Sequence, residues 1–511
     1  MHIFAFSPAG FDGYMVTIEV DIRRGIPGVD IVGLPDGAVK ESRERVRVAI
    51  RNCGFEFPSD RILVNLSPAG IRKEGASFDL PIALGILRAS GQIEEEHERP
   101  DVMVLGELQL DGGIRPVHGV LAAALTGLSR GITRFVVPEA NVLEARAASR
   151  GLVLGIRHLR EAAHVLRLKA APVYAFSKEA NTGNNPELEN FSDIKGQDVL
   201  RRALEIGAAG RHNLFLFGPP GSGKTMAARR VPGLLPLLTR EDSIEVTRIH
   251  SLAGTLPFHQ GLITAPPFRI PHHSASMEGM IGGGKQVKPG EISLAHKGIL
   301  FLDEAAEFRK PLLQSLREPI ETGRVDIARA AGTCWFPADF MLIMAANPCP
   351  CGNLGRDEAA CLCSLHEITL YWKRIGSALL DRIDLRVPVK PAAVTDLVGS
   401  EPEPAINVKN RIREAAERQK KRYGTSGFTF NSRIPPGLVR RFCTLSPELE
   451  ELFVRAVKKL SLSSRACHSI LKVARTIADV SGDEKIGKYH VLEAVQHRRY
   501  GDSHYFWKSS P

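Results

Sequence analysis

Short apolar runs alternate with helical stretches along the first third of the chain. The runs at residues 15–20, 62–66 and 135–137 are rich in β-branched and apolar residues, whereas residues 37–52 have a helical pattern. This alternation predicts one α/β domain over residues 1–170. Residues 171–190 are polar, contain many turn-forming residues and lack apolar periodicity, so they are predicted to form a linker.

A second α/β region is predicted over residues 191–395. Its apolar runs at 214–217, 298–302 and 341–346 are short and uninterrupted, as in strands of a parallel sheet that is covered on both faces. The Pro/Glu-rich residues 401–404 mark the next boundary, and residues 396–511 are predicted to be helical. Ser446, Pro447 and Glu448 are a typical helix start, with an N-cap serine, a first-turn proline and an acid.

Composition adds two constraints to this picture. The chain has 511 residues, 43% of them hydrophobic and 24% charged, which is typical of a globular protein with several domains. A net charge of +10 indicates either a polyanionic partner or simply a solvated basic surface. The chain starts without the features of a secretory signal, and no apolar run could span a bilayer, so a cytoplasmic protein without a membrane partner is expected.

The run at 214–217 leads directly into a glycine-rich phosphate loop. Such a loop turns tightly, presents backbone N–H groups to phosphate oxygens and is followed by the positive end of a helix. Lys224 is expected to bridge the β and γ phosphates of ATP, and the Thr225 hydroxyl to bind Mg²⁺. The predicted nucleotide-binding residues of this loop are Gly218, Pro219, Pro220, Gly221, Ser222, Gly223, Lys224 and Thr225.

Two further apolar runs end in polar side chains. Asp303 and Glu304 follow the second run, at the carboxyl edge where parallel sheets bind ligands. Asp303 is expected to hold Mg²⁺, mostly through water, and Glu304 to orient and deprotonate the attacking water. Asn347 follows the third run and could sense the γ phosphate. The alternatives are an acid pair that caps the next helix and an asparagine that starts a turn before Pro348.

Four cysteines are concentrated in one short stretch after Asn347. Cys349, Cys351, Cys361 and Cys363 could complete a tetrahedral zinc site with a structural role, and His366 could replace one of them. We expect such a metal to stabilise the loop after the third strand. Unliganded cytosolic thiols are the alternative interpretation.

The order and spacing of these motifs resemble a known family. GPPGSGKT, GILFLDEAAEF, AANPCPCG and LLDRIDL resemble the AAA+ module of magnesium-chelatase subunits. The flanking segments IVGLPDGAVKESRERVRVAI, NLSPAGIRKEGASFDLPIAL, FRIPHHSAS and SSRACHSILKVARTIADVSG resemble the ComM/YifB family, over essentially the whole chain. The resemblance implies an AAA+ P-loop NTPase core, an N-terminal Lon-protease-like α/β domain and a C-terminal helical lid domain.

The same resemblance implies roles for individual residues. Asn347 matches the first sensor, Arg382 the arginine finger that reaches a neighbouring subunit, and Arg465 the second sensor. Arg374 and Arg386 are nearby rivals for the finger. The segment FSDIKGQ resembles the adenine-contacting box, which makes Ile194 the apolar contact to the base, although Ser192 or Asp193 could equally cap an ordinary helix.

Two segments could contact DNA. The excursion 251–288 is too long for a plain loop and by resemblance contains the insertion of this AAA+ branch, while residues 324–333 form the hairpin before the first sensor. In related rings both face the pore. The candidate phosphate contacts are Lys285, Lys288, Arg324 and Arg329, each of which could instead be an ordinary exposed cation. His272 and His273 lack further ligands nearby and are expected to be structural or pore-facing.

The resemblance implies a ring, expected to be a hexamer, that hydrolyses ATP and acts on single-stranded or branched DNA. Its expected role is branch migration or helicase activity in recombination or natural transformation. A chelatase-type ATPase that remodels a metal-insertion partner is the second hypothesis. An ATP-dependent protease is disfavoured, because Ser77 matches the Lon nucleophile but Leu121 stands where the catalytic lysine is expected, and a serine without a base is a poor nucleophile.

Overall fold

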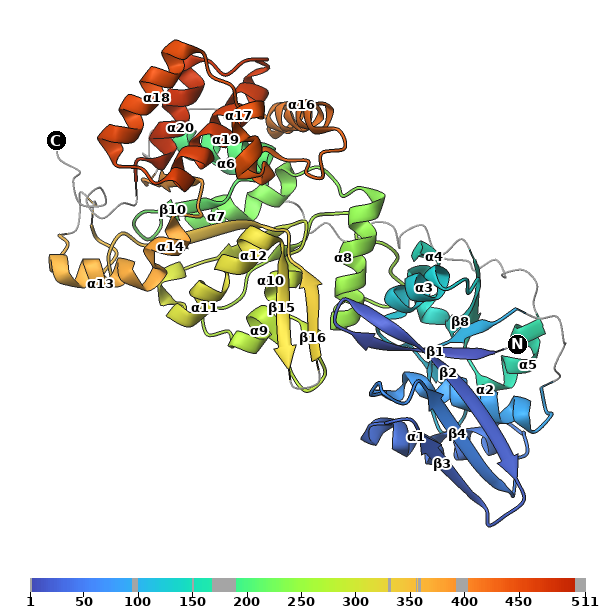
Figure 1. Cartoon of the computed structure of the whole chain (residues 1–511). Coiled ribbons are helices and arrows are strands. Elements are labelled where there is room, and N and C mark those ends of the chain that lie inside the picture. Colours follow the sequence, from blue (N-terminus) through green and yellow to red (C-terminus); the bar gives the residue numbers. More distant parts are fainter. Residues whose placement is uncertain are drawn as a thin grey trace.

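The computed structural model describes residues 2–93, 100–148, 151–167, 190–329, 332–354, 356, 360–391 and 403–500. Nearly all of the predicted linker 171–190 lies outside this range, as do Ala330 and Ala331 of the predicted hairpin and residues 401–402 of the predicted boundary. Figure 1 shows an N-terminal lobe in blue joined to a larger lobe by helix α8 (Arg240–Ala253). Among the described residues, no helix has both the length and the hydrophobicity that crossing a membrane requires.

The N-terminal lobe contains a mixed seven-stranded sheet with the order β3-β4-β2-β1-β5-β8-β9. Strands β1, β2 and β4 pair antiparallel, whereas β1, β5, β8 and β9 pair parallel. The bounds are β1 (Ile3–Ala9), β2 (Asp12–Arg23), β3 (Gly28–Val32), β4 (Arg61–Ser67), β5 (Val102–Val104), β8 (Arg134–Pro138) and β9 (Leu152–Ile156), with a small ribbon of β6 (Glu107–Leu108) and β7 (Ile114–Arg115).

Helices cover this sheet. Its strands β5 and β8 are buried along their whole length, whereas β4 alternates buried side chains with exposed or partly exposed ones. In β4, Ile62, Val64 and Leu66 are completely buried. The predicted helix at 37–52 is confirmed as α1, where the Asp36 carboxylate accepts the Val39 N–H at 2.8 Å as an N-cap. The helices of this lobe are α1 (Gly37–Asn52), α2 (Asp79–Ala89), α3 (Val120–Ser129), α4 (Val142–Ala148) and α5 (Ala162–Arg167).

The central domain has a five-stranded sheet in which all strands are parallel, with the order β11-β14-β17-β10-β18. Every residue of β10, β14 and β17 is buried, as the uninterrupted apolar runs predict. The carboxyl ends of these strands therefore meet at one edge. The strands are β10 (Leu214–Phe217), β11 (Phe268–Arg269), β14 (Ile299–Leu302), β17 (Met341–Ala346) and β18 (Leu385–Pro388).

Helices and two small hairpins surround this sheet. The helices besides α8 are α6 (Asp198–Gly210), α7 (Lys224–Arg230), α9 (Met277–Ile281), α10 (Glu291–Leu294), α11 (Lys310–Ser315), α12 (Arg317–Thr322), α13 (Leu365–Ile375) and α14 (Ser377–Leu380). The hairpins are β12 (Gly282–Gly283) with β13 (Lys288–Pro289), and β15 (Arg324–Arg329) with β16 (Gly332–Pro337).

The C-terminal domain is helical, as predicted, and packs on α6 of the central domain (Figure 1). Its helix α18 begins at Pro447, which confirms the predicted start, although the Ser446 side chain makes no capping hydrogen bond. A buried carboxylate, Asp479, holds Arg422 and Arg475 in ion pairs. The helices are α16 (Ala405–Tyr423), α17 (Val439–Phe442), α18 (Pro447–Leu460), α19 (Ser464–Ser481) and α20 (Lys488–Arg498).

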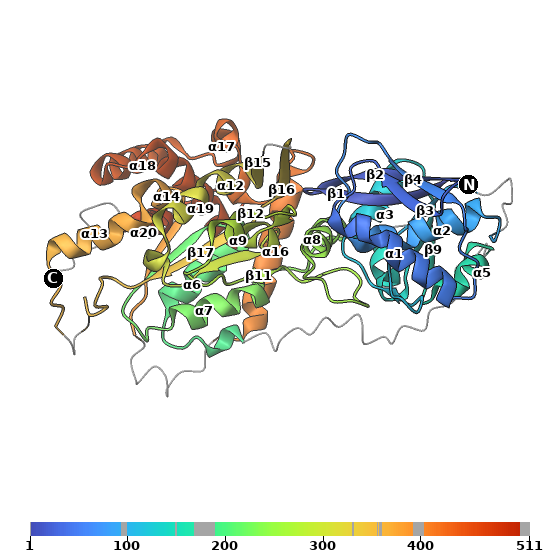
Figure 2. The same cartoon turned by 90° about the horizontal axis from the view of Figure 1, so that it is seen from below.

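The N-terminal lobe is docked on the central domain through α8, which lies between the two in both views (Figures 1 and 2). Ser251 on α8 accepts the Gly119 N–H at 2.9 Å and donates to the Glu144 carboxylate, whose pKa is raised by burial. The Arg248 guanidinium lies 4.1 Å from the centre of the Phe11 ring. Polar and aromatic contacts thus join the two lobes.

Candidate active site

The phosphate loop connects β10 to α7 in the strand, loop, helix order that the sequence predicts. Gly221 and Gly223 have φ values of 77° and 86°, which glycine adopts without strain. A side chain at Gly218 would place its Cβ 2.0 Å from the Val389 carbonyl oxygen. Glycine is therefore required here by both backbone conformation and close packing, and the loop keeps the shape that cradles phosphates.

Lys224 is folded back over this loop and is largely buried. Its ammonium donates to the carbonyl oxygens of Gly218 and Pro219 at 2.7 and 2.9 Å and lies 3.4 Å from the Asn347 Oδ1. Burial lowers the pKa of Lys224 to about 8, against the opposing effect of Asp303. The cation is thus partly desolvated and held at the place where a terminal phosphate would bind.

Side chains from β14 and β17 converge on the same edge. The Thr225 hydroxyl donates to Asp303 Oδ2 at 2.7 Å, so one hydroxyl and one carboxylate are positioned to share a cation. Oxygen donors of this kind suit Mg²⁺, which binds through one or two carboxylates and substrate phosphates. The structure therefore brings together Lys224, Thr225, Asp303 and Asn347, and this donor set fits Mg²⁺ and a nucleotide.

Glu304 follows Asp303 in the chain, but its side chain is exposed and lies near His273. Its backbone is left-handed, with φ 50°, and its N–H donates to Asp303 Oδ1 at 3.0 Å. Its side chain is 60% exposed, and one carboxylate oxygen lies 3.9 Å from His273 Nδ1. Its role as the group that activates water stays a prediction.

Ile194, the predicted apolar contact to the base, lies inside the protein core. Its side chain is completely buried in the core rather than lining a cavity. The neighbouring residues Gly196 and Gln197 line a cavity of about 640 Å³, and the Gln197 amide donates to the carbonyl oxygens of Ser222 and Lys390, both at 2.9 Å. Contact between Ile194 and the base stays a prediction, while Gly196 and Gln197 are the accessible candidates.

The two predicted arginines lie beside each other, with the Arg382 side chain mostly buried and the Arg465 side chain exposed. Arg382, between α14 and β18, and Arg465, at the start of α19, both form ion pairs with Glu321 at the end of α12. The pKa of Glu321 is lowered, because Arg465 and Arg382 outweigh the effect of burial. Two guanidinium groups from different domains thus share one carboxylate at one place.

The rival arginines are less suited to reach a neighbour. Arg386 is only 2% exposed and donates to the Leu380 and Tyr500 carbonyl oxygens at 2.9 and 2.6 Å, so it is committed to the core. Arg374 is more exposed and lies 3.6 Å from Glu307. Between these two, only Arg374 remains a rival on geometric grounds.

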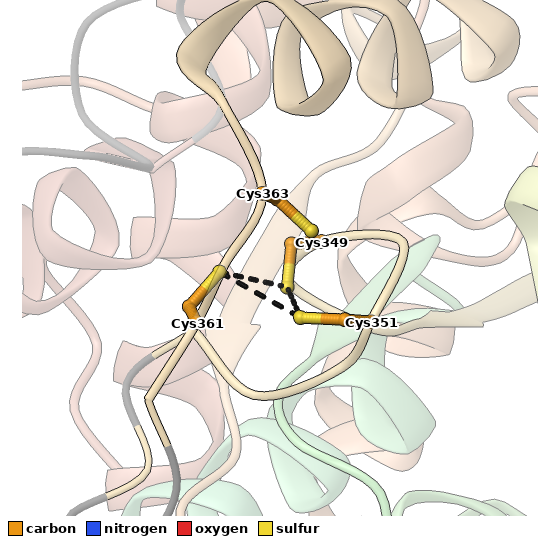
Figure 3. A group of neighbouring side chains, drawn as sticks. All are labelled: Cys349, Cys351, Cys361 and Cys363. Atoms are coloured by element: carbon orange, nitrogen blue, oxygen red, sulfur yellow. Dashed lines mark hydrogen bonds between the residues drawn. The ribbon is translucent and has the colours of Figure 1, made fainter.

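The four clustered cysteines come together as predicted (Figure 3). Their sulfur atoms all lie within 4.8 Å of one another, and Cys349, Cys351 and Cys361 are separated by 3.4 to 3.7 Å. A tetrahedral site with Zn–S bonds of about 2.3 Å places its sulfurs about 3.8 Å apart. The spacing therefore fits a structural zinc ion. This is the one metal-type cluster of His, Cys, Asp and Glu among the described residues, and His366 is not in it.

The cysteine loop is packed against the phosphate loop. A Cβ on Gly352 would lie 2.8 Å from a ring carbon of Pro220, and Arg356 donates to the Pro220 carbonyl at 3.3 Å. On the other side, the Trp372 indole donates to the Pro348 carbonyl at 3.1 Å. The conformation of the cysteine loop is therefore expected to affect the position of Pro220.

The predicted DNA contacts lie on two hairpins that are joined. Lys285, Lys288, Arg324 and Arg329 are all exposed, and Arg329 donates to the carbonyl oxygens of Gly284 and Lys285. Arg324 is 3.0 Å from Asp326 in an ion pair. The β15–β16 hairpin also contacts the N-terminal lobe, where the Phe11 N–H donates to the Trp335 carbonyl at 2.9 Å. The two hairpins therefore form one cationic unit next to that lobe.

The protease-like site has no lysine where the resemblance places one. Leu121 is completely buried in α3, and its N–H donates to Glu144 at 2.8 Å. Ser77 lies in a short 3-10 helix, Ala76–Phe78, and its carbonyl accepts the Gly106 N–H at 3.2 Å. The position of the missing base is thus part of the hydrophobic core, which agrees with a domain that keeps the fold without the catalytic pair.

Three contacts at this site were not predicted from the sequence. Glu321, Gln197 and His273 contact Arg382, the phosphate loop and Glu304, respectively. Gln197 and His273 belong to FSDIKGQ and FRIPHHSAS, two segments that resemble those of known families. Membership of such a segment is a signal by which functional residues can be found. Nothing in the sequence distinguishes Glu321 from other helix-end acids.

Comparison with known proteins places these observations in a family. Three family models match the chain. "Magnesium chelatase, subunit ChlI" matches residues 190–397, "Subunit ChlI of Mg-chelatase" matches residues 18–141, and "Magnesium chelatase, subunit ChlI C-terminal" matches residues 402–498. The chain is 40% identical to competence protein ComM of Haemophilus influenzae, over 97% of each chain, and 39% identical to YifB of Escherichia coli, over 96% of this chain and 95% of YifB.

A separate similarity covers the N-terminal lobe. The chain is 28% identical to the Lon protease of Desulfovibrio desulfuricans over 144 residues, which is 27% of this chain and 16% of that protein. The predicted combination of an AAA+ core, a Lon-like α/β domain and a helical C-terminal domain is therefore confirmed. With near-complete coverage by two relatives, the chain belongs to the ComM/YifB family of magnesium-chelatase-type AAA+ ATPases.

Proposed function

We propose that this protein is a cytoplasmic motor that hydrolyses ATP to move or remodel DNA. The observation that carries the proposal is the convergence of Lys224, Thr225, Asp303 and Asn347 at the carboxyl edge of a parallel sheet. Bound Mg²⁺ would neutralise charge on the transferring phosphoryl group. Thr225 and Asp303 would hold that cation and Lys224 would contact the phosphates, while Glu304 would take the proton of the attacking water.

DNA as the substrate is supported by the exposed cations of the joined hairpins. Lys285, Lys288, Arg324 and Arg329 can neutralise backbone phosphates without reading base sequence. The name of the Haemophilus relative links that protein to competence. A role for this chain in branch migration of single-stranded or branched DNA, during recombination or natural transformation, is consistent with both observations.

A ring explains the position of the two arginines. Arg382 and Arg465 lie together at Glu321. They do not lie over the phosphate loop of their own subunit, where Lys224 contacts Gly218, Pro219 and Asn347. In a hexamer, Arg382 would leave Glu321 and approach a neighbour's γ phosphate as an arginine finger, whereas Arg465 is proposed as the second sensor. A chelatase-type ATPase shares this core, and a DNA-binding test separates the two functions.

DNA should stimulate the ATPase activity in a salt-dependent manner. We expect single-stranded or branched DNA to raise kcat at low salt. Affinity should fall with salt, with a log–log slope reduced by about 0.7 for each single-strand contact that is lost. Replacing Lys285 and Lys288 with alanine should reduce the slope by about 1.4 if both contact single-stranded DNA.

The control for this experiment is a matched pair of cations elsewhere. Lys458 and Lys459, on α18, are also exposed but lie in the C-terminal domain. Their replacement with alanine should leave the slope unchanged. No DNA binding by the wild-type protein at low salt would direct attention to a peptide or metal-insertion partner. DNA-dependent ATPase activity that survives in Lys224→Ala would mean that the activity does not come from this nucleotide site.

We also propose that Cys349, Cys351, Cys361 and Cys363 hold a structural Zn²⁺. Because the cysteine loop touches Pro220, zinc removal should loosen the phosphate loop as well as lower the melting temperature. We expect about one zinc per chain by elemental analysis, lost in a Cys361→Ser/Cys363→Ser variant together with a weaker affinity for ATP. Cys467→Ser, outside the cluster, is the control. Natively purified protein without zinc, and with the same melting temperature in chelator, would contradict the proposal.

A further inference from the structure

Helix α1 of the N-terminal lobe carries a row of cations to which the proposed function assigns no role. Lys40, Arg43, Arg47 and Arg51 are spaced three, four and four residues apart, so they project from one side of the helix. All four are exposed, whereas the opposite side of α1 is buried in the core of the lobe. These four residues, the α1 cation row, extend about 16 Å along the helix axis.

The acids of α1 do not neutralise this row. The helix has five cations and two acids, so its side chains carry a net charge of +3. The fifth cation, Arg45, is committed to the fold, because its guanidinium lies 2.8 Å from the buried Asp79 carboxylate. Glu44 lies 3.7 Å from Arg43, and Glu41 lies 4.0 Å from Arg45. Among the described residues, the ion pairs of α1 thus involve Arg43 and Arg45, and the other three cations of the row are available to a ligand.

An aromatic ring restrains two of these available cations. The guanidinium carbons of Arg47 and Arg51 lie 5.9 and 6.0 Å from the centre of the Phe57 ring, within the range of cation–π contacts. Such a contact restrains a side chain without neutralising its charge. A guanidinium also presents its N–H donors in a planar arrangement that matches phosphate oxygens. This end of the row is therefore preorganised to bind phosphate groups.

The other end of the row begins beside the hairpin that carries predicted DNA contacts. Gly37 and Ala38, the first residues of α1, line a cavity of about 750 Å³ together with Lys285 and Lys288 of the β12–β13 hairpin. Lys40 follows Gly37 by three residues, which is less than one helical turn. The α1 cation row therefore continues the cationic surface of the hairpins onto the N-terminal lobe.

The cavity at this junction has mixed charge. Asp36, Glu74 and Glu278 line it together with Arg72 and the two hairpin lysines. Asp36 serves as the N-cap of α1, and Glu74 lies 3.3 Å from Arg72 in an ion pair. A polyanion is therefore expected to bind along the exposed row rather than inside the cavity, and to pass from the row to the hairpin.

The chemistry of the row fits a phosphate backbone better than a membrane surface. A helix that binds a membrane inserts its apolar face among the lipids, but the apolar face of α1 is buried in the protein. A single phosphate would contact one or two of the four cations, whereas a row about 16 Å long suits a polymer with regularly spaced charges. Continuity with the hairpin favours the polymer that the hairpin is proposed to bind, which is DNA.

We propose that the α1 cation row is a second binding site for the DNA backbone, separate from the motor hairpins and without base recognition. The four cations hold the strand on the N-terminal lobe while the β12–β13 and β15–β16 hairpins move. The lobe thereby keeps the strand bound between cycles of ATP hydrolysis. This inference rests on the proposed DNA motor, and it gives the N-terminal lobe a binding role in place of proteolysis.

Removing charge from the row should reduce the salt dependence of DNA binding. The row variant is Arg47→Gln/Arg51→Gln, which keeps α1 helical because glutamine has a helix propensity close to that of arginine. If both arginines contact single-stranded DNA, the log–log slope should fall by about 1.4. Between about 50 and 200 mM salt, the affinity of the row variant should then fall about sevenfold less than that of the wild type. Fluorescence anisotropy of a labelled single-stranded oligonucleotide measures both affinities.

The ATPase assay supplies an independent readout. In the row variant, the DNA concentration that gives half-maximal stimulation should rise, because the strand is held less tightly. The kcat without DNA and the kcat at saturating DNA should both stay at the wild-type value, since α1 contributes no residue to the nucleotide site.

Two matched variants make the binding test specific. Arg47→Lys/Arg51→Lys keeps both charges and should keep the wild-type slope. The control variant Arg130→Gln/Arg146→Gln removes two exposed cations from the same lobe, one directly after α3 and one in α4. Helices α3 and α4 cover the other face of the sheet from α1, so the control variant should also keep the wild-type slope.

The outcomes separate this inference from the proposed function. A wild-type slope in the row variant, with a lowered slope in Lys285→Ala/Lys288→Ala, would overturn the α1 site and leave an acidic protein as the candidate partner of the row. An equal decrease in the control variant would overturn it too, since the effect would then not be local to α1. If only the row variant has a lowered slope and DNA fails to stimulate ATP hydrolysis by the wild type, the α1 site stands and the motor function fails. Absence of DNA binding by the wild type at low salt would contradict both.

Discussion

Replacing Glu304 with glutamine should lower kcat for ATP hydrolysis by about 10²- to 10⁴-fold, the usual contribution of a positioned general base. The substitution keeps the size of the side chain but removes its ability to accept a proton from water. Lys224, Thr225 and Asp303 make no hydrogen bond with the Glu304 side chain in the structure, so the affinity for ATP should change little. Single-turnover hydrolysis and equilibrium binding of a fluorescent ATP analogue measure the two quantities separately.

Glu307→Gln is a matched control for this experiment. Glu307 lies three residues further along the chain and is paired with Arg374 at the surface. The Glu307→Gln protein should hydrolyse ATP at close to the wild-type rate. A Glu304→Gln protein with a kcat within about threefold of wild type would mean that another group activates the water.

Arg382→Ala should have an effect of similar or larger size, because an arginine finger contributes about 10³- to 10⁵-fold in kcat. In the proposed ring, this guanidinium would stabilise charge on the phosphoryl group that is transferred in the adjacent subunit. Glu321 would keep Arg465 as its partner in the variant, so the fold of each subunit should be preserved. Steady-state ATPase assays on assembled rings measure the loss, and Arg374→Ala tests the remaining rival.

A mixing experiment decides whether this arginine acts between subunits. Arg382→Ala subunits keep an intact Glu304, and Glu304→Gln subunits keep an intact Arg382. A mixed ring should therefore contain some complete sites at the boundary between the two kinds of subunit, and activity should reappear on mixing. Mixed rings that assemble but remain inactive would place Arg382 outside the neighbouring site.

The N-terminal lobe has a buried leucine, Leu121, where the resemblance to Lon proteases places the catalytic lysine, and it makes polar and aromatic contacts with the motor. Glu144 connects α3 to Ser251 on α8, and Phe11 contacts both Arg248 and Trp335. A domain anchored to α8 and to the β15–β16 hairpin is placed to follow movements of the motor. These contacts support an assembly role for the lobe.

The sequence by itself determined the nucleotide site and much of the secondary structure. Uninterrupted apolar runs predicted β10, β14 and β17. The glycine-rich loop after the first run predicted Lys224, and Asp303 and Asn347 were predicted because they directly follow the other two runs. This works because parallel strands end at a common edge, so residues distant in the chain become neighbours by a local rule. The cysteine spacing likewise placed four sulfurs together, since short loops allow few other arrangements.

Only the tertiary structure decided which distant elements contact each other, because no local sequence pattern relates those elements. The shared position of Arg382 and Arg465 at Glu321 depends on how α19 packs over α12, and the contact of His273 with Glu304 depends on β11 being the neighbour of β14. The burial of Ile194 follows from core packing around α6. Such pairings arise from the packing of whole elements, so they do not appear as a pattern along the chain.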